Sequence, residues 1–88
     1  MITIEKGHVS RLMLLEAYAE KHEIEEKLKY YRRIYNKTFK EFEKELKDTQ
    51  TENFKHFDDY MEWKAYKKQM EELNARIEEL KSANIKVA

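Results

Sequence analysis

The three histidines of this sequence are its first candidates for metal or acid–base chemistry. His22 precedes Glu26 by four residues and Glu52 precedes His56 by four, so each pair would share one helix face. A zinc site needs three or four converging ligands, and the sequence has neither an HExxH motif nor a histidine cluster. We therefore expect no metal site, and His8 is read as solvated like the other two.

Carboxylates and serines are the other groups that could do catalytic chemistry. The acidic pairs at 25–26, 71–72 and 78–79 alternate with lysines, which is typical of solvated helix faces. A catalytic acid would need a pocket that perturbs its pKa, and a few narrow helices rarely enclose one. Ser10 and Ser82 have no base–acid pair near them, and a single glycine excludes a glycine-rich phosphate loop. We predict a protein without catalytic residues and without a cofactor.

A basic segment rich in aromatic residues spans residues 27–40, and it contains no acidic residue between positions 28 and 40. Its cations could neutralise phosphates while its tyrosines stack on bases. The neutral total charge weighs against this function, and Tyr31, Tyr35 and Phe39 also fit an apolar core stripe. Nucleic-acid binding by a small dimer is therefore the alternative hypothesis, and its candidate residues are Lys29, Arg32, Arg33 and Lys37.

Residues 58–63, Asp-Asp-Tyr-Met-Glu-Trp, concentrate carboxylates and large apolar side chains. Tryptophan and tyrosine are frequent interface anchors, because they bury a large area and keep a polar group. The competing interpretation is that Trp63 begins the core of the last helix. We hypothesise a partner-binding surface made of Phe54, Phe57, Tyr60, Trp63 and Tyr66.

These side chains must be positioned by helices, because apolar residues recur at helical spacing along most of the chain. The first helix is predicted over about residues 9–36. The apolar run 12–15 is too wide for one seam, so we expect it to be covered on two sides. The apolar stripe of this helix consists of Leu12, Leu15, Tyr18, Ala19, Ile24, Leu28, Tyr31 and Tyr35.

Two capping boxes delimit the remaining helices. Thr38 with Glu41 predicts a break at 36–38 and a short helix over about 38–47, although an unbroken helix through residue 47 is the alternative. Asp59 with Glu62 predicts the start of a last helix over about 58–82, preceded by a loop or helical turn at 54–57. Its seam has the 3.5-residue period of coiled-coil packing and runs through Trp63, Tyr66, Met70, Leu73, Ile77 and Leu80.

The two ends of the chain leave one structural alternative open. Residues 2–4, Ile-Thr-Ile, and residues 85–87, Ile-Lys-Val, are rich in β-branched residues and therefore β-prone. An isolated two-stranded ribbon is marginal in water, so this pairing would need support from the helices or another chain. Whether the ends form strands is left undecided by the sequence.

We predict an all-α fold, a single helical domain over residues 1–88, in which an antiparallel hairpin of helices 9–36 and 58–82 is closed by the short helix 38–47. A two-helix hairpin leaves two sides open, so we also predict a homodimer that forms a helical bundle. The predicted core consists of Leu15, Ile24, Leu28, Tyr31, Tyr35, Phe39, Phe42, Phe57, Trp63, Tyr66, Met70, Leu73, Ile77 and Leu80.

Composition narrows the class of protein further. The 88 residues carry 18 positive and 18 negative charges and no cysteine, which suits a reducing compartment. No apolar run approaches the roughly 18–20 residues of a membrane span, and Glu5 and Lys6 interrupt any N-terminal signal. We expect a cytoplasmic protein that does not enter a membrane.

Two motifs carry a resemblance to a known group of proteins. The stretch 35–43, Tyr-Asn-Lys-Thr-Phe-Lys-Glu-Phe-Glu, and the stretch 57–66, Phe-Asp-Asp-Tyr-Met-Glu-Trp-Lys-Ala-Tyr, resemble small prokaryotic, largely archaeal, helical proteins that look like antitoxins of toxin–antitoxin pairs. The resemblance covers about residues 24–87. It implies a non-catalytic interaction module that binds and neutralises a protein toxin. A recognisable DNA-binding segment of the usual antitoxin kind is missing, and a structural coiled-coil element is a further alternative.

Overall fold

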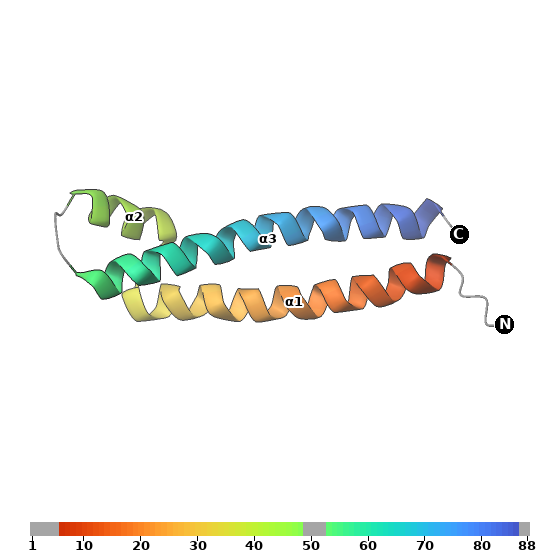
Figure 1. Cartoon of the computed structure of the whole chain (residues 1–88), viewed down its shortest axis with the longest axis horizontal. Helices are drawn as coiled ribbons and strands as arrows, with labels where there is room; N and C mark the ends of the chain where they lie inside the picture. Colours follow the sequence, from red (N-terminus) through yellow and green to blue (C-terminus); the bar gives the residue numbers. More distant parts are fainter. Residues whose placement is uncertain (1–5, 49–52, 87–88) are drawn as a thin grey trace.

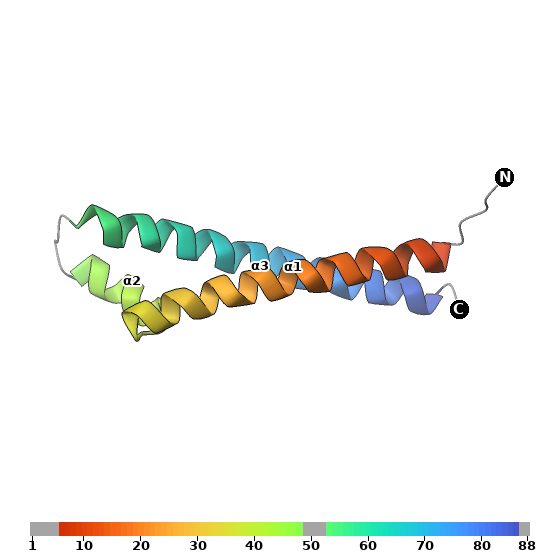
Figure 2. The same cartoon turned by 90° about the horizontal axis from the view of Figure 1, so that it is seen from below.

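The computed structural model describes residues 6–48 and 53–86, which form three helices and no strand. Helix α1 spans Lys6–Tyr35, α2 spans Phe39–Asp48 and α3 spans Phe54–Lys86. α1 and α3 lie antiparallel, and α2 packs on α3 at one end of this 62 × 21 × 18 Å rod (Figure 1). Turned by 90°, the two long helices cross at a shallow angle (Figure 2). The predicted all-α hairpin is confirmed.

A single heptad seam holds the two long helices together. On α1 the residues that face α3 include Ala17 and Ile24, both buried, and on α3 they are met by Leu73 and Ile77. Each helix places one apolar stripe against the other, since residues spaced 3 and 4 apart share a face. Half-buried neighbours extend this cluster in both directions along the seam: Leu14, Leu28, Tyr66, Met70 and Leu80.

The break between α1 and α2 is confirmed, and its local causes are visible. Asn36 adopts a φ of 53°, the left-handed conformation that ends helices and that asparagine tolerates better than most residues. Thr38 then caps α2, because its Oγ1 accepts from the Glu41 backbone N–H at 3.3 Å. The Thr38 hydroxyl also donates to Glu41 Oε1 at 3.0 Å, so the Glu41 side chain contacts the capping side chain. The reversal places α2 against the first turns of α3.

The predicted start and end of the last helix were wrong. α3 begins at Phe54, where Asn53 Oδ1 accepts from the His56 backbone N–H at 3.4 Å. Asp59 therefore lies inside the helix, and its carboxylate accepts from the Tyr35 hydroxyl instead of capping. Ile85 and Lys86 are helical, so the strand alternative is wrong for them, because helix propagation adds a hydrogen bond that a lone strand cannot make. Residues 2–4 and Val87 lie outside the described residues.

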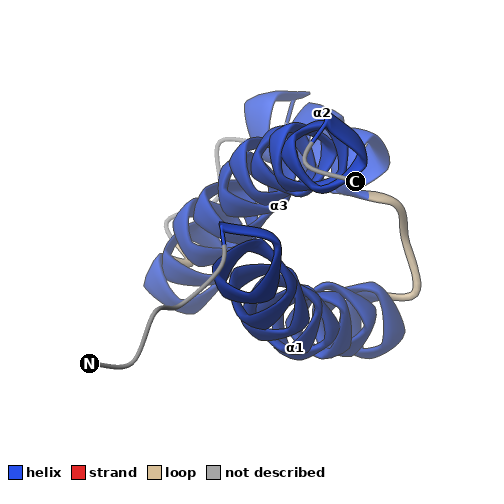
Figure 3. Cartoon of the chain, turned by 90° about the vertical axis from the view of Figure 1, so that its right-hand side faces the viewer, coloured by secondary structure: helices blue, strands red, loops and turns tan. Residues whose placement is uncertain are grey.

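The assignment of two residues to the core was also wrong. Leu15 is 66% exposed and Phe57 is 57% exposed, whereas Leu14 and Ala17 occupy the seam near the start of α1. The apolar run at 12–15 contains two stripes, and within the described chain one neighbouring helix covers only one of them. Seen end-on in Figure 3, α1 and α3 lie beside each other and α2 lies behind α3 at the far end. The other predicted core residues are buried or half-buried.

Candidate protein interaction site

Trp63 is the centre of an aromatic cluster where the three helices meet. Its indole lies parallel to the ring of Tyr31, with centroids 5.7 Å apart, and is met by Phe42 at 5.6 Å and Phe39 at 5.4 Å. Trp63, Tyr31 and Phe42 are each at most 4% exposed. Rings in such offset or edge-on arrangements add attraction beyond the area they bury. The cluster makes this end of the hairpin a packed platform.

Two tyrosine–carboxylate hydrogen bonds join the helices around this platform. The Tyr35 hydroxyl donates to the Asp59 carboxylate and links α1 to α3, while the Tyr60 hydroxyl donates to Glu43 Oε2 at 2.6 Å and links α3 to α2. Burial and the bond to Asp59 raise the pKa of Tyr35 above its ordinary value. The hydrogen bond from Tyr60 lowers the pKa of Glu43, so that carboxylate is held in its charged form.

The five residues predicted to bind a partner divide between core and surface. Trp63 is 3% exposed and Tyr66 is half-buried, so both pack within the chain. Tyr60 is half-buried and stacks on Phe39 with centroids 5.5 Å apart. Phe54, at 81% exposure, and Phe57 project into solvent. The structure therefore leaves the two phenylalanines as the accessible part of the hypothesised surface.

Sequence reasoning missed Met61, which is 53% exposed and follows Phe57 by four residues. The spacing 54, 57 and 61 puts all three side chains on one helix face, and that face is opposite the seam residues of α3. The spacing of these residues is visible in the sequence, but it defines a helix face only because α3 begins at Phe54. We call Phe54, Phe57 and Met61 the α3 outer face.

A second exposed apolar surface lies on α1 near its start. Leu12 and Leu15 point away from the seam, and Val9, Met13 and Tyr18 beside them are also exposed. The sequence assigned part of this stripe to the core, as reported above. We call Val9, Leu12 and Leu15, which share one side of the helix, the α1 outer face. Tyr18 lies on the side of α1 nearer α3, where its ring centroid is 5.9 Å from the Lys81 ammonium.

The four residues of the nucleic-acid hypothesis do not form one cationic face. Lys37 is hydrogen-bonded to Glu45, and the Lys29 ammonium lies 3.8 Å from a Glu26 carboxylate oxygen. Arg33 is exposed at the end of α1. Arg32 lines a cleft together with Lys29. The structure thus brings Lys29 and Arg32 together and directs Lys37 toward α2.

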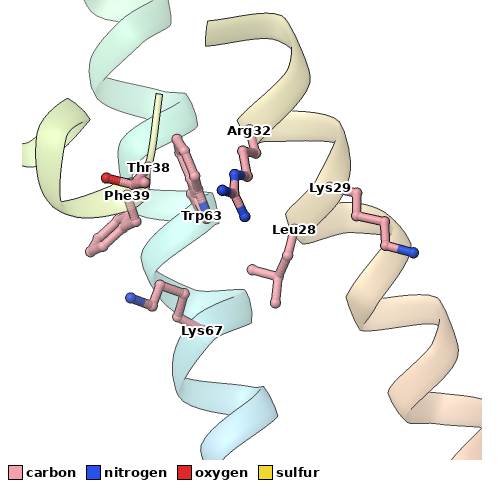
Figure 4. A pocket seen from close by; sticks show the side chains of 7 residues that line it. All are labelled: Leu28, Lys29, Arg32, Thr38, Phe39, Trp63 and Lys67. Carbon is pink, nitrogen blue, oxygen red and sulfur yellow. The ribbon is translucent and has the colours of Figure 1, made fainter. Parts of the chain in front are cut away.

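The cleft that contains Arg32 has a volume of about 230 Å³ and opens between the three helices (Figure 4). Its apolar walls come from Leu28, Phe39 and Trp63. Figure 4 shows Arg32 extending toward Trp63 from α1, while Lys67 of α3 reaches toward the Phe39 ring. The Lys67 ammonium is 4.6 Å from that ring centroid. Thr38 and Lys29 complete the lining.

The histidines do not assemble into a metal site within the part of the chain that the structure describes, where no group of three potential ligands is found. His56 instead lies edge-on to Tyr35, with ring centroids 5.2 Å apart. His22 is exposed, and Glu52 lies outside the described residues. Among the described helices, none is long and apolar enough to cross a membrane.

Comparison with known proteins returned no relatives. No protein-family model matches the chain, and neither the curated proteins nor the solved structures include a match.

Proposed function

We propose that this chain is a non-catalytic protein–protein interaction module whose principal contact surface is the α3 outer face. The observation that carries the proposal is the exposure of Phe54, Phe57 and Met61 on one face of the first two turns of α3. Large apolar side chains gathered on a surface and rimmed by charge are characteristic of binding sites. Lys64 and Asp58 supply that rim.

The platform beneath this face supports the proposal. Tyr60 lies beside Phe57, with ring centroids 6.4 Å apart, and is itself held by Phe39 and Glu43. A contact surface whose supporting side chains are already ordered loses little conformational entropy on binding. The partner we expect presents an apolar groove or helix face with basic and acidic residues at its edge.

The resemblance to antitoxin-like proteins suggests that this partner is a toxin, and we propose that the chain neutralises it by covering the toxin's functional surface. The test begins with the neighbouring genes. A small adjacent reading frame should arrest growth when expressed alone and should be tolerated when this chain is coexpressed. If no adjacent frame is toxic, or if this chain gives no protection, the antitoxin proposal is wrong.

Variants locate the contact within that experiment. Phe57→Ser combined with Met61→Ser should abolish protection and complex formation, because both side chains contact solvent in the free chain. Tyr30→Ser is the matched control, since Tyr30 is 50% exposed on α1 and lies outside the α3 outer face. Protection that survives the double substitution would contradict the assignment of this surface. Circular dichroism checks that the helices remain.

We further propose that the chain is a homodimer joined through the α1 outer face. Its accessible surface is 7410 Å², whereas a compact monomer of 10.9 kDa would expose roughly 5,600 Å². The difference exceeds the roughly 800 Å² per partner that a standard interface buries. Size-exclusion chromatography with light scattering should give twice the chain mass. A monomer at micromolar concentration would contradict the dimer.

The alternative function is nucleic-acid binding through Lys29, Arg32, Arg33 and Lys37. Exposed Tyr30 beside these cations is the observation in its favour, since an exposed ring can stack on a base. The pairing of Lys29 and Lys37 with carboxylates weighs against it. A mobility shift at low salt that is lost on Arg32→Glu with Arg33→Glu would support this function. No shift with either DNA or RNA would remove it.

A further inference from the structure

The cleft beside Trp63 is assembled from three separate segments of the chain. α1 contributes Leu28 and Arg32, the α1–α2 turn and the start of α2 contribute Thr38 and Phe39, and α3 contributes Lys67 with Trp63. Figure 4 shows these side chains around one opening. The cleft therefore exists only when all three helices are packed, and none of its lining residues belongs to the α3 outer face.

Its volume suits one side chain better than a whole small molecule. Sites for drug-sized ligands occupy about 300–1,000 Å³, while an engineered cavity of about 150 Å³ in another protein holds a single benzene ring. At about 230 Å³, this cleft can accept the aromatic or branched side chain of a peptide. Leu28 and Phe39 would supply the apolar contacts.

The charges at its rim are all positive. Lys29, Arg32 and Lys67 line the cleft, and no carboxylate does. In Figure 4 the Lys29 ammonium points away from the opening, and the Arg32 guanidinium points over it. Arg32 makes no ion pair with any carboxylate of the described residues. A guanidinium in this position can hold a carboxylate through two parallel hydrogen bonds.

We propose that this cleft binds an acidic segment of a partner protein, which inserts an apolar side chain against Leu28 and Phe39 and sets an adjacent carboxylate on Arg32. The inference rests on the proposed function in one respect, that the partner is a protein. It adds a second contact site and states the chemistry of the segment that fills it. Lys67 strengthens the attraction for a second acidic residue of the same segment.

A peptide fits this site better than a nucleic acid does. Bases stack on exposed ring faces, and Trp63 is 3% exposed while Phe39 is half-buried beneath Lys67. A nucleic-acid strand also needs cations spaced along its successive phosphates, whereas these cations line a single cleft. The formal net charge of the chain is zero. The combination of an apolar pocket with a guanidinium at its edge matches a carboxylate next to an apolar side chain.

The test uses the full chain and a phage library of random dodecapeptides. We expect selection to enrich peptides in which Asp or Glu flanks an aromatic or branched apolar residue. The best peptide, made synthetically, should change the emission of Trp63, the single tryptophan of the sequence. Arg32→Glu should weaken its binding at least tenfold, and Arg32→Gln should weaken it less. Arg33→Glu, an exposed neighbour outside the cleft, should change it less than twofold.

Several results would overturn the proposal. One is that the selected peptides contain no acidic residues, or that the selection enriches no peptide. Another is binding that Arg32→Glu and Arg33→Glu weaken equally, which indicates a diffuse charge effect. Enriched peptides that match this chain's own acidic segments would indicate a second copy as the occupant. Binding of a twenty-residue oligothymidylate that Arg32→Glu abolishes, without any selected peptide, would indicate nucleic acid.

The experiment also separates this inference from the proposed function. If the toxin complex is lost with Phe57→Ser and Met61→Ser but withstands Arg32→Glu, the cleft proposal is wrong and the interaction module stands. If acidic peptides bind at Arg32 while no partner is neutralised, the cleft proposal stands and the antitoxin proposal falls.

Discussion

The Tyr35 hydroxyl donates a hydrogen bond to the Asp59 carboxylate, joining the last residue of α1 to the second turn of α3. The two residues are 24 positions apart, and all of α2 lies between them in the sequence. This bond fixes where the hairpin closes, and the aromatic platform is built directly beside it.

Tyr35→Phe removes the donor of this bond and leaves the ring. Hydrogen bonds to charged groups contribute about 1.5–3 kcal/mol when intact, and partial solvent access reduces that value, so we expect a loss of about 1–2 kcal/mol in the free energy of unfolding. Urea denaturation followed by circular dichroism measures it. Tyr30→Phe, at an exposed position, is the control and should change stability by less than about 0.5 kcal/mol.

Trp63 and Phe57 should respond in opposite ways to truncation. Trp63→Ala removes the centre of a packed aromatic cluster and should cost about 3–5 kcal/mol, enough to unfold a domain of this size. Phe57→Ala should alter stability by no more than about 0.5 kcal/mol and should affect binding instead. Thermal melts of the two variants distinguish the core role from the surface role. Equal losses for both would show that Phe57 is packed in solution.

Leu15→Glu tests the proposed dimer interface. A carboxylate on the α1 outer face would be buried without a partner at the interface, so light scattering should report the mass of one chain. The helical signal should persist, because Leu15 makes no contribution to the seam. Ile34→Glu, also at an exposed apolar position but at the other end of α1, should leave the dimer intact.

The Tyr60–Glu43 bond predicts a dependence of stability on pH. The folded state lowers the pKa of Glu43 below its ordinary value of 4.5, so its stabilising contribution is present above that value and is lost as pH falls through the folded pKa. The difference in melting temperature between wild type and Tyr60→Phe should therefore be largest near pH 7 and should shrink toward pH 3. A difference that is constant with pH would show that Glu43 is not the acceptor in solution.

Asn36 offers a test of the turn that creates the platform. Asn36→Val should cost about 1–2 kcal/mol, because a β-branched residue is strained at a φ of 53°. Asn36→Gly should be neutral or slightly stabilising, since glycine adopts this conformation without strain. Denaturation midpoints of both variants measure the effect. If the two substitutions are equally harmful, the asparagine side chain itself is needed.

The sequence predicted one helix boundary correctly and another incorrectly. Thr38 and Glu41 located the break correctly, because a cap and its amide lie within one turn. The same reasoning failed at Asp59, because α3 already begins at Phe54, where Asn53 accepts from the His56 backbone N–H. Where two capping candidates lie close together, as Asn53 and Asp59 do, the local pattern did not determine which one starts the helix.

By itself the sequence determined that this protein is helical, where its chain reverses and that Trp63 lies on a seam, because helix periodicity and capping depend on neighbours within a few residues. Only the tertiary structure decided which of two apolar stripes on α1 is buried and which is exposed. It also decided that Leu28, Phe39, Arg32 and Lys67 surround one cleft, because that arrangement depends on the angle and register at which three helices meet.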